Sequence, residues 1–454
     1  MSLYWFWLAW LGLIFFTRPY DGQVYRNVQW RYSNGNTLFH RGSDVLLENC
    51  LCEWNDWTTI GGCAPGVYTG SSTMCLHDSS DNATVTRLTM RKNGRSAGLR
   101  PGGHGGKPPV LEFIHFSEQF QIMGDGCFVE AAGNPSPTIH HCWSHDSGKS
   151  ALRFDGYYTP SNLQTMTSHG QMLFNVGWNV TALAVKGDWH NVSRNTVFDG
   201  PPEISPNVLA HSLPRFQDSS SSLQNTSVPS LAIGAGTKSY DPRADQNTRV
   251  SKNIFDAIGI KGTPCPSPDA DTAAPAASCP PGIYSDNVVA KEQPFDIKQL
   301  LRDPWNWDFR PCPGSRAALL SAGAYDPSST TASGDSVYWI PGARLAVPST
   351  PVPKDHGSDV VRNTDLIFLG AYRATGHAVF FGAAADGERG MAVVAQLHGD
   401  ANVVALPRPL TPGARYIWRV DAQLAGGSTR RGDVWTFAAG PGLACARDRT
   451  DRRE

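Results

Sequence analysis

The segment HHCWSHDSGKSALRFDG, residues 140–156, gathers three histidines, two aspartates, a lysine and an arginine into seventeen positions. Two later segments, HGQ at 169–171 and VKGDWH at 185–190, add further groups of the same kinds. Carboxylates and imidazoles can transfer protons, and cations can stabilise negative charge that develops in a reaction. The candidate catalytic residues are Asp146, Arg153, Asp155, His169, Lys186 and Asp188, and His145 and His190 are candidate substrate contacts.

Short strands are the elements that would have to position these groups. In SALRFDG, strand alternation places Leu152 and Phe154 on the inner face, so that Arg153 and Asp155 point outward together. We expect the following two coils to supply the other candidates, so that residues 140–190 line one groove.

Six short segments can be aligned on an asparagine, with spacings of 22, 20, 58 and 34 residues between pairs; the residues are Asn27, Asn49, Asn175, Asn195, Asn253 and Asn287. His141 fits the asparagine slot of TIHHCWSHD. Repeats of 20 or more residues built from strands predict a β-solenoid, in which each coil buries its apolar face against the next. Stacked asparagines can hydrogen-bond one another, so we assign them a structural role and no catalytic one.

From about Val24 to Tyr325 the chain resembles right-handed parallel β-helix proteins of the pectin-lyase-like class, especially bacterial-type members of glycan-degrading repertoires. The most specific segments are SNGNTLFHRGSDVLLENCLCEWNDW, HHCWSHDSGKSALRFDG, HGQMLFNVGWNVTALAVKGDWHNVSRNTVFDG and WNWDFRPCPGSRAALLSAGAY. The last looks like the segment with which such helices commonly end. The resemblance implies an extended, acidic or sulfated polysaccharide as substrate.

Two reactions on such a polymer fit the candidate residues. Hydrolysis needs two carboxylates that flank the glycosidic bond, from among Asp146, Asp155 and Asp188. β-Elimination on a uronic acid needs a base and a cation, for which Lys186, Arg153 or a histidine would serve. The aromatic pair of WNDW, Trp54 and Trp57, is suited to stacking on sugar rings.

A purely structural interpretation competes with the catalytic one. His140 and His141 would then occupy strand positions with ladder packing or a capping hydrogen bond, Arg153 and Asp155 would form an exposed ion pair, and Lys186-Gly187-Asp188 would be a turn. Under this interpretation the protein is a non-catalytic glycan-binding or adhesive surface protein. Carboxylates too far apart for a glycosidase, with no cation near the base, would favour it.

After the linker DPSSTTASGDS, five or six short strands with polar turns predict a small antiparallel β-sandwich. YIWRVDA and GDVWTF resemble fibronectin type III-like modules of secreted bacterial-type carbohydrate enzymes. Trp418 and Trp435 alternate with polar neighbours, so we expect both in its core.

Composition limits the classes of function. The chain has 454 residues, 39 basic and 40 acidic, with no basic stripe, so we expect no nucleic-acid partner.

The cysteines suggest disulfides more than metal binding. Cys265 and Cys279 bracket a loop that a disulfide could restrain. The spacing of Cys50, Cys52, Cys63 and Cys75 disfavours zinc ligation. Together with the sequons at Asn82, Asn179, Asn191 and Asn225, the ten cysteines favour the secretory pathway.

The apolar run Leu3 to Phe16 is short for a membrane span, and it lacks the basic n-region and the cleavage site of a signal peptide. Three interpretations stay open for it: a signal peptide, an anchor or a cap. A coil already begins by Val24, so either the first coils are missing or the run covers the open end of the helix. We expect an apolar segment at 1–22, a β-helix at 23–325, a linker at 326–340, the sandwich at 341–440 and a charged tail at 441–454.

The sequence thus predicts an all-β chain, a right-handed parallel β-helix followed by a small antiparallel β-sandwich. We expect a secreted or cell-surface monomer that is a polysaccharide lyase, a glycoside hydrolase or a glycan-binding protein, attached to a membrane only if the N-terminal run is an anchor. We expect no cofactor; calcium would suit a lyase, although no Asp-rich loop makes a calcium site compelling.

Overall fold

The computed structural model describes residues 14–15, 21–33, 37–57, 72–77, 81–94, 97–101, 106–119, 127–131, 136–147, 150–155, 167–180, 183–198, 231–233, 247–255, 258–260, 263–264, 282–289, 297–326 and 337–445. The chain forms two compact units. The first comprises Met1–Gln293, Ala322–Ala324 and Pro341–Ala343, and the second Pro294–Ser321, Tyr325–Ile340 and Arg344–Glu454.

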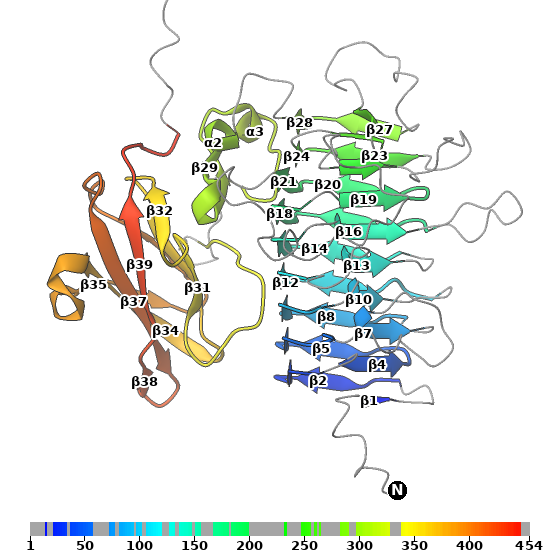
Figure 1. The fold of residues 1–454 in the computed structure, drawn as a ribbon, viewed down its shortest axis with the longest axis horizontal. Coiled ribbons are helices and arrows are strands. Elements are labelled where there is room, and N and C mark those ends of the chain that lie inside the picture. The colour runs from blue at the N-terminus through cyan, green and yellow to red at the C-terminus, as the bar shows by residue number, and fades with distance from the viewer. Residues whose placement is uncertain are drawn as a thin grey trace, which may run out of the picture. The chain divides into compact units, whose positions relative to one another are not determined.

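The first unit is a right-handed parallel β-helix whose coils run through three long sheets (Figure 1). We name the sheets A, B and C. Sheet A contains β1 (Ile14–Phe15), β4 (Leu38–Arg41), β7 (Ser72–His77), β10 (Ala97–Pro101), β13 (Cys127–Ala131), β16 (Ser150–Asp155), β19 (Leu183–Lys186), β22 (Leu231–Ile233), β25 (Ile258–Ile260) and β26 (Thr263–Pro264). Its strands pair in parallel except at β25 and β26.

Sheets B and C are parallel throughout their described strands. Sheet B contains β2 (Val24–Arg26), β5 (Leu46–Glu48), β8 (Thr84–Thr86), β11 (Val110–Glu112), β14 (Thr138–His140), β17 (Gln171–Leu173), β20 (Asn191–Ser193), β23 (Thr248–Ser251) and β27 (Gly282–Ser285). Sheet C contains β3 (Gln29–Arg31), β6 (Leu51–Glu53), β9 (Thr89–Arg91), β12 (His115–Ser117), β15 (Trp143–His145), β18 (Val176–Trp178), β21 (Thr196–Phe198), β24 (Ile254–Phe255) and β28 (Val288–Val289). Each coil passes from B through C to A.

The core of the helix is a set of apolar columns, because equivalent strand positions stack on one another. The central residue of successive sheet B strands is buried and fully shielded from solvent; this column includes Leu47, Val85, Leu111, Ile139, Met172, Val192 and Val250. In β16, Leu152 and Phe154 point inward as expected.

Each corner between sheets B and C is a turn of two residues. The first has a positive φ, and the residues at this position are Asn27, Asn49, Arg87, Phe113, His141, Phe174, Arg194, Lys252 and Asp286. The second points into the helix, and in four coils it is an asparagine: Asn175, Asn195, Asn253 and Asn287. The predicted stacking of asparagines is therefore present, but it divides between two positions. His141 lies opposite Phe174 in the sheet register, so it occupies the corner position of Asn27 and Asn49 and not that of Asn175. Its predicted alignment therefore holds for the first position only.

The four inward asparagines form what we call the asparagine ladder. The side-chain amide of Asn195 donates to Asn253 Oδ1 (3.0 Å), and its own Oδ1 accepts from the amide of Asn175 (3.0 Å). It also accepts the backbone N–H of Asn175 and donates to the carbonyl of Met172. One side chain thus satisfies polar groups in three consecutive coils.

The second unit contains a β-sandwich. One sheet has the order β31 (Ser349–Val352), β33 (Asp365–Leu369), β36 (Val403–Ala405); the other has β32 (Gly357–Val360), β39 (Val434–Ala439), β37 (Arg415–Leu424), β34 (Ala374–Ala383), β35 (Ala392–His398), with β38 (Thr429–Arg430) beside β37. All pairs are antiparallel except β32 with β39. Trp418 and Trp435 are buried in the core with ring centroids 4.7 Å apart, which confirms their predicted location.

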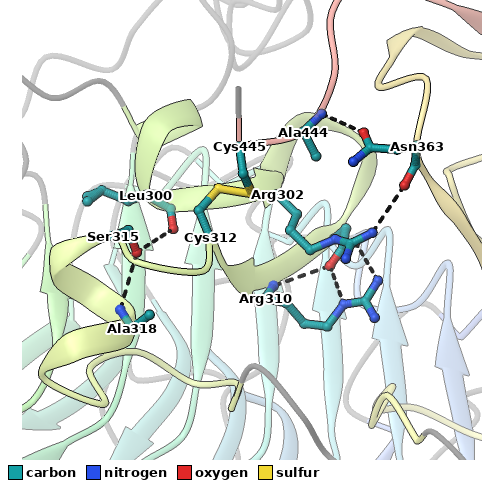
Figure 2. The surroundings of a disulfide bond; sticks show 10 residues. Leu300, Arg302, Arg310, Cys312, Ser315, Ala318, Asn363, Ala444 and Cys445 are labelled. Carbon is teal, nitrogen blue, oxygen red and sulfur yellow. Dashed lines mark hydrogen bonds and ion pairs between the residues drawn. A yellow bond between two sulfur atoms is a disulfide. The ribbon is translucent and has the colours of Figure 1, made fainter. Parts of the chain in front are cut away.

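Residues 294–321 belong to the second unit, although the sequence assigned them to the end of the β-helix. They form α2 (Ile297–Leu300), β29 (Leu301–Asp303), η3 (Pro304–Asn306), β30 (Asp308–Pro311) and α3 (Arg316–Leu319); two further turns, η4 (Ala384–Asp386) and η5 (Glu388–Gly390), lie in the sandwich. A disulfide joins Cys312 to Cys445 (Figure 2). Arg310 contacts Asp365 of β33 at 2.7 Å, so covalent and ionic links hold the segment to the sandwich.

Several expectations fall on residues outside the described part of the chain. They are the apolar run apart from Ile14–Phe15, the Cys265 to Cys279 loop, Cys63, the sequon at Asn225, linker residues 327–336 and tail residues 446–454. Cys50 and Cys52 are buried free thiols, as are Cys127 and Cys142.

Replacing Asn195 with alanine should lower the stability of the β-helix by roughly 2–4 kcal/mol, because it leaves several buried donors and acceptors without partners. The midpoint of urea or thermal unfolding measures this loss. Ser193→Ala, in the same coil but on the part-exposed outer face of sheet B, is the matched control and should cost much less. Equal losses in the two variants would contradict a structural role for the ladder.

Candidate functional site

Three of the predicted catalytic residues meet on the outer face of sheet A. Arg153 and Asp155 project from β16, and Lys186 projects from β19, directly opposite Asp155 in the register. An Arg153 guanidinium nitrogen lies 2.8 Å from Asp155 Oδ2, and Lys186 pairs with Oδ1 of the same carboxylate. The sequence analysis missed a fourth member, Glu130 of β13, which lies opposite Arg153 and 3.3 Å from it. We call these four residues the sheet A cluster.

The sheet A cluster is compact and has no net formal charge. Glu130 and Asp155 contact the same guanidinium nitrogen, so the two oxygens are no more than about 6 Å apart. Two acids face two bases, so the formal charges cancel. Only 5% of the Asp155 side chain and 25% of the Lys186 side chain are exposed. The cluster therefore brings two carboxylates close together, but each is already engaged by a cation.

Asp146 cannot act with Asp155 on one glycosidic bond. Asp146 lies at the corner before β16, whereas Asp155 is the last residue of that six-residue strand. Six extended residues span about 16 Å, beyond the roughly 6.5–9.5 Å between the carboxylates of inverting glycosidases. Asp146 instead accepts hydrogen bonds from Asn179 at 2.6 Å and from His145 at 2.7 Å.

His145 is buried on the outer face of sheet C. Its ring stacks on Trp178 with centroids 4.2 Å apart. Nδ1 of His145 hydrogen-bonds to the carboxylate of Asp146, and Nε2 lies 2.8 Å from Nε2 of His115. Burial holds the pKa of His115 well below its usual value. Only 6% of His145 is exposed, which argues against sugar contact by this residue.

The residues of VKGDWH lie around the corner between sheets A and B. Gly187 has a φ of +106°, and an added Cβ would lie 2.0 Å from the carbonyl oxygen of Thr167, so this turn requires glycine. His169 occupies the same corner one coil earlier, and a bridge between Ser168 and Asp188 joins the two coils. His169 and Asp188 therefore lie together at the corner between sheets A and B, next to the strand that carries Lys186.

His190 is an interior residue with 1% exposure. Its Nδ1 accepts the backbone N–H of Gly170 at 3.0 Å, so Nε2 carries the proton and donates to the carbonyl of Lys186 at 3.1 Å. The ring stacks on Phe154. Burial lowers the pKa of His190 to about 4. These contacts place it in the core, where a surface polysaccharide does not reach.

His141, in the segment 140–156, is a stacking residue. Its ring lies between those of Phe113 and Phe174, with centroids 5.1 and 5.0 Å away. Arg87 and Arg194 cover the two outer faces of this aromatic column. The arrangement fits the structural interpretation of His141.

A separate set of aromatic residues lies at the corner between sheets C and A in the first coils. Trp54 and Trp57 stack with centroids 5.9 Å apart, and with Tyr32 and Ser33 they line an open pocket of about 310 Å³. We call this the aromatic pocket. Tyr32 is 75% exposed and Trp54 39% exposed. The sequence analysis named both tryptophans but missed Tyr32, since only the stacking of coils places it beside them.

Basic residues flank the aromatic pocket. The Lys92 ammonium lies 5.0 Å from the centroid of the Trp54 ring. On the adjacent strands, Arg31 and Arg91 both pair with Glu53, at 2.7 and 2.6 Å, which leaves an excess positive charge in this row. Lys92 also lies 3.8 Å from the carboxylate of Glu118. The pocket is thus apolar on its walls, with cations and carboxylates together at its edge.

Within the described residues, no three His, Cys, Asp or Glu side chains gather in a way that could hold a metal ion. The helices of the described ranges are all too short or too polar to cross a membrane. Comparisons with protein-family models, with curated proteins and with solved structures find no match to this chain.

The low pKa of His190 predicts a loss of stability in acid. The His190 imidazole binds a proton near pH 6.5 in the unfolded chain but only near pH 4 in the folded chain. Its contribution to the free energy of unfolding is therefore complete above pH 6.5 and is lost as the pH falls to about 4. It amounts to about 3 kcal/mol. In unfolding measured from pH 7.5 to 4, His190→Gln should show a shallower decline than the unmodified chain. Parallel declines would refute the assignment.

Proposed function

We propose that the protein is a carbohydrate-active β-helix that binds an extended, acidic polysaccharide, with the aromatic pocket as a principal contact. The observation that carries the proposal is the exposure of Tyr32 and Trp54 around an open pocket. Exposed aromatic side chains that converge on one pocket mark a ligand site more often than a folding requirement.

The chemistry of the pocket matches a sugar ring. A pyranose presents a face of C–H groups, which packs against the apolar face of an indole or phenol ring, while its hydroxyl groups stay in water. Lys92 and the row of Arg31, Glu53 and Arg91 supply positive charge beside this surface. A uronic or sulfated sugar would satisfy both features, which supports an acidic polymer over a neutral one.

Replacing Trp54 with alanine should weaken polysaccharide binding at least about tenfold, which corresponds to a loss of about 1.4 kcal/mol of binding free energy. The measurement is calorimetric titration with polygalacturonate, alginate, chondroitin sulfate and xylan. Ile283→Ala removes another exposed apolar side chain, 55% exposed on sheet B, and should bind normally. The proposal fails if none of the four polymers binds, or if Trp54→Ala binds as tightly as the unmodified chain.

A second candidate function is catalysis at the sheet A cluster, as a glycoside hydrolase or a polysaccharide lyase. The observation in its favour is the proximity of Glu130 and Asp155, because retaining glycosidases hold their carboxylates roughly 5–5.5 Å apart. For elimination, Lys186 would first pass a proton to Asp155 and then take the C5 proton of a uronic acid, while Arg153 neutralises the sugar carboxylate. The C4–O bond would break as the C4–C5 double bond forms, and Asp155 would give its proton to the leaving oxygen.

Asp155→Asn should abolish product formation if this cluster is catalytic. Ultraviolet absorbance of unsaturated sugars together with new reducing ends would indicate elimination, and reducing ends alone would indicate hydrolysis. Asp286→Asn, at an exposed corner far along the chain, is the control. A protein that binds a polymer without forming either product would exclude the enzyme and leave the binding function. The proposed reactions need no cofactor, and calcium stays an option for the lyase alone.

We further propose that the first unit is pectin-lyase-like and that the sandwich is a fibronectin type III-like module that spaces or docks the helix. The phenol oxygen of Tyr416, near the start of β37, accepts the backbone N–H of Thr411 at 3.0 Å. Such a tyrosine corner is characteristic of immunoglobulin-like sandwiches and supports the assignment.

A secreted or cell-surface location suits this function. The Cys312–Cys445 disulfide supports an oxidising compartment, because cytosolic thiols are kept reduced. We propose a monomer with a polysaccharide as its partner, no role for nucleic acid, and membrane attachment only through an N-terminal anchor.

A further inference from the structure

One more exposed aromatic residue, Trp189, lies on the β-helix away from the aromatic pocket. It is 57% exposed and occupies the corner between β19 and β20, with a φ of 61°. Its ring is within 4° of parallel to that of His169 in the preceding coil, and the centroids are 6.3 Å apart. We call these two residues the Trp189 platform.

The requirements of the fold do not explain a tryptophan at this position. In other coils the same corner carries Asp44, Asn82 and Asn247, all with positive φ. Asparagine and aspartate adopt this conformation with least strain, whereas a bulky aromatic residue adopts it at a cost. The next residue, His190, provides the inward contacts of the corner, so Trp189 is free of that task.

The Trp189 platform and the aromatic pocket lie at opposite edges of sheet A. Trp54 is at the corner that leads toward β7, and Trp189 is at the corner that follows β19. Four strand spacings separate β7 from β19 in the sheet order. At about 4.8 Å per spacing, the two sites are at least about 19 Å apart along the helix axis. A disaccharide cannot reach both, but a chain of several sugars can.

We infer that Trp189, with His169 beneath it, is a second sugar-stacking site that an extended polysaccharide occupies together with the aromatic pocket. This inference rests on the proposed glycan-binding function and adds a requirement for chain length. Contact at two sites on one rigid helix makes the second contact intramolecular, so long chains bind more tightly than short ones.

The test compares Trp189→Asn with Trp54→Ala on two probes: the long-chain polymer that binds best among polygalacturonate, alginate, chondroitin sulfate and xylan, and its own disaccharide. Asparagine is the residue found at this corner in other coils, so the variant should fold and melt normally. We expect Trp189→Asn to weaken binding of the polymer at least about tenfold and to leave disaccharide binding unchanged. Trp54→Ala should weaken both, and Trp189→Phe, which keeps an aromatic face, should retain most of the affinity for the polymer.

The outcomes separate the two ideas. If Trp54→Ala loses affinity but Trp189→Asn binds the polymer normally, the platform is refuted and the proposed function stands. If Trp189→Asn weakens the disaccharide and the polymer equally, it does not act as a distinct second site and the inference fails. If the unmodified chain binds none of the polymers, the proposed function fails and the platform with it. Asn247→Ala, at the same corner one coil later, controls for a change in backbone at a positive φ.

Discussion

A coil of this β-helix cannot satisfy its own polar corner groups, and the coil stacked on it must do so. The asparagine ladder shows the dependence most directly, since Asn195 bonds groups on the coils before and after it. The corner between sheets B and C has two residues throughout the described coils, and in the four coils of the ladder a longer turn would break its hydrogen bonds. Insertions accumulate at the other corners, as with residues 199–230 between β21 and β22. Corners outside the ladder are therefore where the chain can vary and acquire function.

Stacking in parallel register also governs the charges on the outer faces. Equivalent positions of neighbouring coils lie about 4.8 Å apart, so like charges there repel and opposite charges attract. Glu130 beside Arg153, Asp155 beside Lys186, and Glu53 between two arginines all obey this rule. Such rows of ion pairs are expected on any charged solenoid face. The aromatic residues of the pocket need no such pairing, and their exposure calls for an explanation from function.

The repeat, the inward face of β16 and the core of the sandwich could be predicted from sequence, because local alternation decides them. The alternation of inward and outward side chains is interrupted at a corner, because a residue of positive φ there changes which side of the chain faces the core. The sequence analysis for this reason chose His190 as a surface residue, although Trp189 is the one exposed, and aligned Asn175 with Asn49, which lies one residue earlier at its own corner. Glu130 joins its partners only through neighbouring coils, and Cys312 finds Cys445 across 133 residues. No local pattern encodes either pairing.

The carboxylates of the sheet A cluster are already paired with cations, and this pairing bears on the choice between binding and catalysis. Arg153 and Lys186 already neutralise Glu130 and Asp155, so a neutral sugar offers nothing that would separate these pairs. The carboxylate of a uronic acid would compete with Asp155 for Arg153 and thereby release a protein carboxylate or an amine beside the sugar. An acidic polymer is thus the ligand that could turn a structural ion-pair row into reactive groups. The cations around the aromatic pocket would favour the same polymer, so the proposed acidic ligand would suit both surfaces.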